Sequence, residues 1–259
     1  MRTGLLTDVV GHRGAAAGAP ENTLASLALA AEQGARMVEF DVKLTADGAL
    51  ILMHDETLER TTTGRGQVAE TPLARIRELD AGAWRGPAWR HTPVPTLEEA
   101  VAILDERDLS ANIEIKPCPG RDVETAEATV DLLRRAWPRH RPWPLLSSFS
   151  RASLAAARDR APEIPRGLLL WGKPSDWSAA ARSLGCLTVH CAQQHLTPEW
   201  AAEIGRLGYG LAAYTVNDPA DAARLRGWGV DSIITDDPGA LIAAGAGGRR
   251  RGFNGRRAL

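Results

Sequence analysis

The segment Met37-Val38-Glu39-Phe40-Asp41-Val42-Lys43 places two carboxylates inside an otherwise apolar stretch that is typical of a buried strand. Successive side chains of a strand point to opposite faces, so Glu39 and Asp41 share one face. In the interior of a barrel, residues such as Val or Ile normally fill such positions. Burying an unpaired charge costs several kcal/mol per ion. We therefore expect positive charge, from a metal ion or from basic side chains, against this face.

Similar apolar runs recur along the whole chain, and each is followed by an amphipathic stretch rich in Ala, Leu and Arg. The pattern predicts strands at residues 8–11, 37–43, 111–115, 144–148, 166–170, 187–190, 210–214 and 232–235. It predicts helices at residues 22–34, 96–107, 121–135, 151–160, 176–184, 197–207, 219–228 and 238–243. Eight strands, each followed by a helix, indicate an α/β protein with a closed, TIM-type (β/α)8 barrel. An open doubly wound sheet is the alternative, but it usually has fewer repeats.

The second strand is followed by a segment that the barrel repeat does not explain. Asp47-Gly48 separates two apolar runs and predicts a hairpin, so the strand folds back as a ribbon. Residues 55–95 are too long for a simple loop, and we expect them to form a small insertion over one end of the barrel. We expect residues 1–244 to form a single catalytic barrel domain. Residues 245–259 form a basic Gly/Arg tail that we expect to be disordered.

The charge balance argues against a nucleic-acid-binding protein. The chain has 31 Lys and Arg against 32 Asp and Glu, but the tail holds five arginines and no acidic residue. The rest of the chain is therefore acidic, which disfavours wrapping a polyanion. No apolar run approaches the roughly 20 residues that span a bilayer, and the three cysteines form no CxxC pattern. We expect a cytoplasmic protein without membrane insertion; its oligomeric state cannot be derived from the sequence.

Charged side chains gather at the predicted carboxyl ends of the first three barrel strands, where barrel enzymes carry their active sites. Glu114 lies in the third predicted strand, residues 111–115, and like Glu39 and Asp41 it interrupts an apolar run. Three carboxylates without sulfur ligands suit one Mg²⁺ or Ca²⁺ ion. The alternative is that these acids form salt bridges. In that case the basic partners of the carboxylates would be Arg13, Lys43 or Lys116.

Two histidines and two basic residues accompany the carboxylates. His12 follows the first strand and His54 ends the ribbon, so both can serve as general acid or base near neutral pH. Arg13 and Lys116 add positive charge, for which a phosphate group is the natural partner. The other histidines (His91, His140, His190 and His195) and the serines Ser147 and Ser148 are weaker candidates. Trp84, Trp89, Trp171 and Tyr214 could line a substrate pocket or simply pack.

Several segments in order along the chain resemble the glycerophosphodiester phosphodiesterase family, in particular its short cytoplasmic bacterial branch. They include Gly11-His12-Arg13-Gly14, Pro20-Glu21-Asn22-Thr23, Val38-Glu39-Phe40-Asp41, Met53-His54-Asp55, Leu58-Glu59-Arg60-Thr61-Thr62, Asn112-Ile113-Glu114-Ile115-Lys116-Pro117, Tyr214-Thr215-Val216-Asn217 and Ile233-Ile234-Thr235-Asp236.

This resemblance implies a TIM-type barrel with an insertion after the second strand, and it implies a role for each candidate residue. Glu39, Asp41 and Glu114 match the ligands of a Mg²⁺ or Ca²⁺ ion. His12 and His54 match the catalytic acid–base pair, and Arg13 and Lys116 match the phosphate contacts. The implied reaction is hydrolysis of glycerophosphodiesters to sn-glycerol 3-phosphate and an alcohol through a cyclic phosphate. The alternatives are a lysophospholipase D-type activity and a non-catalytic barrel that binds phosphodiesters.

Overall fold

The computed structural model describes residues 5–246, and eight parallel strands in it close into a barrel. The barrel strands are β1 (Val9–His12), β2 (Met37–Leu44), β4 (Ser110–Ile115), β5 (Leu145–Ser148), β6 (Arg166–Leu170), β7 (Thr188–Ala192), β8 (Gly210–Tyr214) and β9 (Ser232–Thr235). Each strand pairs with its sequence neighbours around the ring, and β1 closes the barrel by pairing with both β9 and β2. The predicted (β/α)8 barrel is therefore confirmed.

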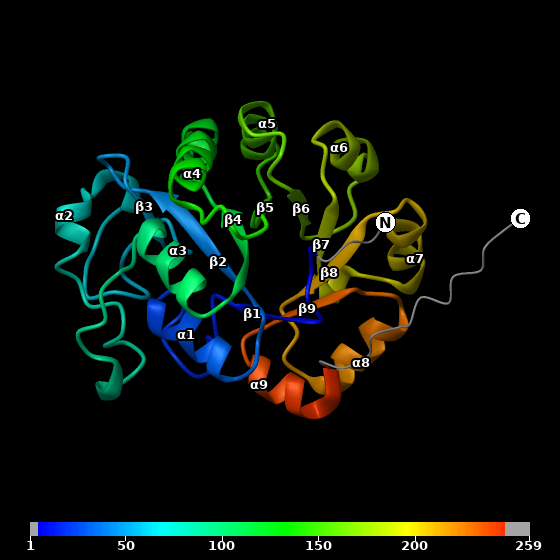
Figure 1. Ribbon diagram of the computed structural model, residues 1–259, viewed down its shortest axis with the longest axis horizontal. Helices are drawn as coiled ribbons and strands as arrows, with labels where there is room; N and C mark the ends of the chain where they lie inside the picture. Colours follow the sequence, from blue (N-terminus) through cyan, green and yellow to red (C-terminus); the bar gives the residue numbers. More distant parts are fainter. Residues whose placement is uncertain (1–4, 247–259) are drawn as a thin grey trace, which may run out of the picture.

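Helices surround the ring of strands, as Figure 1 shows. They are α1 (Leu24–Glu32), α3 (Leu97–Glu106), α4 (Asp122–Ala136), α5 (Arg151–Arg160), α6 (Trp177–Ser183), α7 (Pro198–Arg206), α8 (Pro219–Gly227) and α9 (Pro238–Leu241), the last continuing into the π-helical turn η4 (Ile242–Ala246). Local sequence signals set several helix starts. Thr96 and Glu99 form a reciprocal capping box at α3, and Thr197 caps α7 immediately before Pro198.

The ribbon and the insertion follow the second strand, as expected. β2 runs on beyond the barrel and pairs with the antiparallel β3 (Leu50–Leu52) through a turn in which Gly48 has a φ of +79°. The segment between β3 and α3 contains the short helices η1 (Val68–Glu70), α2 (Leu73–Ile76) and η2 (Pro87–Trp89). Its apolar side chains form a small core of their own beside the barrel, including Met53, Leu58, Val68, Ile76 and Val94. The insertion lies on one side of the barrel in Figure 1.

The barrel interior is apolar toward one end and charged toward the other. Val10, Met37, Leu145, Ala212 and Ile234 pack together inside the ring. The outward faces of the strands pack on the helices in two larger apolar clusters. The charged strand residues therefore lie toward the carboxyl ends of the strands, above an apolar layer that excludes water.

Two further expectations from the sequence concern the basic tail and membrane insertion. The basic tail predicted at residues 245–259 lies outside the described residues from 247 onward. Within residues 5–246, every helix is too short or too polar to cross a membrane.

Candidate active site

The pairing register of the first barrel strands brings the charged residues to two successive levels at the carboxyl end of the ring. His12 on β1 is paired with Glu39 on β2, and Asp41 on β2 is paired with Glu114 on β4. Glu39 is also the partner of Asn112. Paired residues in parallel strands point to the same face, so these side chains converge inside the barrel mouth.

The three carboxylates form one compact cluster. Glu39, Asp41 and Glu114 each offer an oxygen within 4.8 Å of the others, and all three side chains are buried. Burial, followed by repulsion from Asp41, raises the pKa of Glu39 well above its usual range and that of Glu114 to about 7. Burial also acts to raise the pKa of Asp41, but Lys116 and Arg13 hold it below its ordinary value. An oxygen-only donor set with excess negative charge fits a hard divalent cation.

Two basic side chains compensate part of this charge. Lys116 donates to Glu114 at 2.7 Å and lies 3.5 Å from Asp41, while the Arg13 guanidinium lies 3.4 Å from Asp41. Lys43, the third cation considered from the sequence, instead donates to the backbone carbonyl of Lys116 at 3.1 Å. When all three carboxylates are ionised, these two cations leave one negative charge uncompensated, which a bound metal ion could neutralise.

His12 is held by an acid from the far end of the chain. Its Nδ1 lies 2.6 Å from Oδ1 of Asp236, which follows β9. Asn217 donates to the other oxygen of Asp236 at 2.7 Å. Because a carboxylate only accepts hydrogen bonds, Nδ1 of His12 carries the proton. Nε2 is then directed into the barrel mouth, 3.9 Å from Glu39.

His54 is held in the same way by its sequence neighbour. Its Nδ1 lies 2.7 Å from Oδ1 of Asp55, which leaves Nε2 free to face the mouth. Burial lowers the pKa of His54, and the carboxylate of Asp41 opposes this shift. The neutral imidazole is therefore the main form of His54 at neutral pH.

Asn22 and the turn around it hold the carboxylate cluster in place. Asn22 donates to Oδ2 of Asp41 at 2.9 Å, and its own side-chain oxygen accepts from the backbone N–H of Asp41 at 3.1 Å. The φ angles of Arg13 and Asn22 are +50° and +55°, a left-handed region that non-glycine residues rarely occupy. Such strain concentrates at functional sites. The backbone N–H of Arg13 donates to Glu39 at 3.1 Å.

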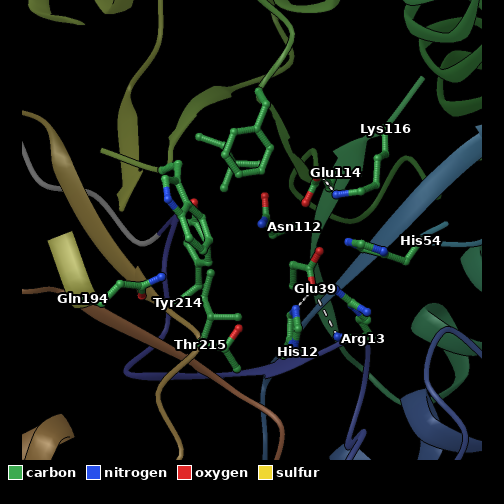
Figure 2. Close-up of a pocket in the computed structure, with 14 residues that line it drawn as sticks. His12, Arg13, Glu39, His54, Asn112, Glu114, Lys116, Gln194, Tyr214 and Thr215 are labelled. Carbon is green, nitrogen blue, oxygen red and sulfur yellow. Dashed lines mark hydrogen bonds and ion pairs between the residues drawn. The ribbon is translucent and has the colours of Figure 1, made fainter. Parts of the chain in front are cut away.

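A cavity of about 370 Å³ opens between the charged residues and a less polar wall. Figure 2 shows His12, Arg13, Glu39, His54, Glu114 and Lys116 on one side, and Gln194, Tyr214 and Thr215 on the other. The apolar lining residues are Phe149, Leu169, Trp171, Tyr214 and Ile234. Tyr214 is oriented by a 3.0 Å hydrogen bond to the carbonyl of Leu170.

The structure brings all seven predicted site residues together and sorts the weaker candidates. Trp171 and Tyr214 line the cavity, whereas Trp84 and Trp89 belong to the insertion. His190 is fully buried inside the barrel, and the Ser148 hydroxyl donates to the carbonyl of Ile115.

Asp55 and Asp236 were missed as functional residues, although both lie in segments that carry the family resemblance. From the sequence alone, Asp55 is seen to follow His54, and Asp236 is seen to follow a predicted strand. The sequence does not show which histidine each carboxylate contacts, so neither acid could be given a role.

Comparison with known proteins identifies the family. A model of the glycerophosphoryl diester phosphodiesterase family matches residues 12–240. The chain is 36% identical over 241 residues to a glycerophosphodiester phosphodiesterase of Caldanaerobacter subterraneus subsp. tengcongensis, covering 91% of this chain and 96% of that protein. It is also 36% identical over 247 residues to a glycerophosphodiester phosphodiesterase of Bacillus subtilis, covering 88% and 83% of the two chains.

A solved structure is similar over nearly the same length. It is a phosphodiesterase of Oleispira antarctica in complex with the product sn-glycerol-3-phosphate. That structure superposes with a TM-score of 0.90 at 39% identity, covering 92% of this chain and 96% of that chain. The chain therefore belongs to the glycerophosphoryl diester phosphodiesterase family.

Proposed function

We propose that the protein hydrolyses glycerophosphodiesters, such as glycerophosphocholine, to sn-glycerol 3-phosphate and the free alcohol. The observation that carries this proposal is the compact oxygen cluster of Glu39, Asp41 and Glu114, flanked by two histidines that each have a carboxylate partner. Family membership supports the reaction class, and the product in the Oleispira antarctica structure supports the substrate class.

The carboxylate cluster is where one divalent cation, Mg²⁺ or Ca²⁺, would bind. When bound, such an ion supplies positive charge that stabilises a phosphate oxygen and lowers the pKa of a nearby hydroxyl. Glu39, Asp41 and Glu114 provide its oxygen ligands, and Asn22 keeps Asp41 in the required orientation. The raised pKa of Glu114, about 7, is consistent with a site that is overcharged without a cation.

Arg13 and Lys116 bind the phosphate in this proposal. Both line the cavity, and both are already held by carboxylates that fix where their N–H groups lie. Their positive charges offset the charge that develops on the phosphate oxygens during bond exchange. A planar guanidinium also orients a phosphate through two parallel hydrogen bonds.

The two histidines exchange protons with the reacting oxygens. One imidazole removes the proton from the attacking glycerol hydroxyl as its oxygen bonds to phosphorus. The other protonates the alcohol oxygen as its bond to phosphorus breaks, and a cyclic phosphate results. Water then opens the ring with the two roles reversed. Each such acid–base step contributes roughly 10²- to 10⁴-fold in rate.

Product analysis tests this function. The protein is stripped with EDTA, reloaded with Mg²⁺ or Ca²⁺, and incubated with glycerophosphocholine, glycerophosphoethanolamine and glycerophosphoglycerol. We expect sn-glycerol 3-phosphate only in the metal-loaded samples, and a cyclic product should accumulate when His12 or His54 is replaced. Full turnover in excess EDTA contradicts the metal assignment. A protein that binds but never cleaves these compounds is a non-catalytic barrel instead.

A lysophospholipase D-type activity is the second candidate, and the exposed aromatic residues favour it. Phe149 and Trp171 line the cavity and are 44% and 60% exposed, so an acyl chain could rest on them. Comparing the hydrolysis of glycerophosphocholine with that of its acylated lysolipid separates the two activities.

We place the reaction in the cytoplasm, because the sequence motifs resemble those of the short cytoplasmic bacterial branch of the family.

A further inference from the structure

The segment Leu58-Glu59-Arg60-Thr61-Thr62 belongs to the family resemblance but has no part in the mechanism derived so far. It lies in the insertion, outside the barrel. Leu58 is buried in the insertion's core, and the Thr62 hydroxyl donates to the carbonyl of Leu58 at 2.6 Å while it accepts from the backbone N–H of Gly64 at 2.9 Å. These contacts fix the turn that carries Arg60.

Arg60 binds two carboxylates at once with its guanidinium. Its Nε and Nη2 donate to the two oxygens of Asp55 at 2.5 and 2.9 Å. Its Nη1 and Nη2 donate to the two oxygens of Glu21 at 2.7 and 2.8 Å. Glu21 lies in the loop between β1 and α1, so one side chain of the insertion connects two separate segments of the chain.

Each of these carboxylates also holds a side chain of the proposed active site. Asp55 accepts from Nδ1 of His54 at 2.7 Å through the same oxygen that Nη2 of Arg60 contacts. Glu21 accepts from the Arg13 guanidinium at 2.7 Å, again through an oxygen shared with Arg60. Arg60 therefore lies directly behind the partner of one histidine and the partner of one phosphate-binding arginine.

We propose that Arg60 is a positioning residue that orients the His54 imidazole through Asp55 and the Arg13 guanidinium through Glu21. The inference rests on the proposed function, since it assigns those two side chains to proton transfer and phosphate binding. The planar guanidinium is required because only a fork with several N–H groups can satisfy four carboxylate oxygens in fixed directions. Hydrogen bonds from Arg60 are also the largest influence that lowers the pKa of Asp55, to about 2.

A merely structural salt bridge makes a different prediction. The Arg60 side chain is 44% exposed, and ion pairs at such positions contribute little to stability. Arg151 offers a matched control, because it binds Asp176 through two hydrogen bonds of 2.6 and 2.8 Å and is 45% exposed. R151Q breaks the same kind of contact between two residues that do not line the cavity, and it should change neither kcat nor KM.

The test separates two branches by substitution. The His54 branch runs from Arg60 through Asp55 to His54, and the Arg13 branch runs from Arg60 through Glu21 to Arg13. D55N cuts the His54 branch and should lower kcat while KM for glycerophosphocholine changes little. E21Q cuts the Arg13 branch and should raise KM and weaken binding of inorganic phosphate. R60Q should do both, by about 10- to 100-fold each, the range typical of residues that orient functional groups. In R60Q/D55N, kcat should be no lower than in D55N alone, because the two changes break one pathway. R60K should recover only part of the loss.

Calorimetric binding of inorganic phosphate to the full-length, metal-loaded protein gives a readout that does not depend on turnover. If the wild type hydrolyses none of the glycerophosphodiesters, the proposed function fails, but weaker phosphate binding by R60Q and E21Q than by R151Q still supports the role of Arg60. The inference is overturned if R60Q matches R151Q in phosphate affinity and kinetics, or if wild-type protein binds no phosphate. It is also overturned if R60Q lowers the thermal unfolding midpoint well below that of R151Q, because that result assigns Arg60 to stability.

Discussion

His190 should make the folded protein lose stability as the pH falls. Its side chain is fully buried inside the barrel, where Nε2 lies 3.0 Å from the Thr188 hydroxyl. Gly167 leaves room for the ring, since a Cβ at that position would lie 2.9 Å from Nε2. Burial lowers the pKa of His190 from 6.5 to about 4. The folded state therefore requires the neutral imidazole.

The size of the effect follows from the two pKa values. Between pH 6.5 and pH 4 the unfolded chain binds a proton at His190 that the folded chain does not, so acid favours unfolding. The destabilisation is absent well above pH 6.5, grows as the pH falls from 6.5 towards 4, and levels off below the folded value of about 4. At 1.36 kcal/mol per pKa unit, this destabilisation amounts to about 2 kcal/mol by pH 5 and about 3 kcal/mol by pH 4.

Urea unfolding of the wild type and of His190→Asn at pH 7, 6, 5 and 4 measures this contribution. EDTA is present throughout, so that metal binding adds no pH dependence of its own. The variant loses packing at every pH, but its free energy of unfolding should fall by about 3 kcal/mol less than that of the wild type between pH 7 and pH 4. His190→Gln should show the same pH dependence at a different absolute stability. Parallel curves for all three proteins would refute the reasoning.

Three further predictions concern the site and the opposite end of the barrel. Glu114→Gln should weaken Mg²⁺ or Ca²⁺ binding, measured by calorimetry, by more than the roughly 10- to 100-fold that loss of an outer partner costs. Asp236→Asn should lower kcat by about 10²- to 10⁴-fold with little change in KM, because the amide group then donates to Nδ1 of His12 and moves its proton to Nε2. Arg166→Met should lower the free energy of unfolding by about 2–4 kcal/mol in urea titrations and leave kcat unchanged. The buried guanidinium of Arg166 donates to backbone carbonyls, including those of Ile164 and Leu184, that would lose their partner.

The order of strands and helices could be predicted because each strand–helix unit of the barrel has a recognisable local sequence pattern. An apolar run of four or five residues is followed by a helix with its own cap, as at Thr96 and Thr197. The strand ends were less certain because pairing, not composition, decides them. His12 belongs to β1 because it pairs with Glu39, and β7 extends to Ala192 because it pairs with Tyr214.

The carboxylate cluster was predictable for a related reason. The two-residue alternation of a strand puts Glu39 and Asp41 on one face, and the position of Glu114 in the next barrel strand brings it alongside. The contact between His12 and Asp236 joins residues 224 positions apart, and only closure of the barrel between β1 and β9 creates it. A single sequence contains no local signal for such a contact.

The charges around the cavity alternate in sign outward from its centre, and this order explains what the site can attract. The three central carboxylates meet Arg13 and Lys116, Arg13 meets Glu21, and Glu21 meets Arg60. With all three carboxylates ionised, the centre carries one negative charge more than Arg13 and Lys116 supply, and further out the single charge of Arg60 is shared by Glu21 and Asp55. A divalent cation would therefore turn the centre from one negative charge to one positive charge, which matches the single negative charge of a phosphodiester. Because burial and mutual repulsion raise the pKa values of Glu39 and Glu114 in the free protein, cation binding would release protons from these carboxylates and at the same time add positive charge that attracts a phosphodiester.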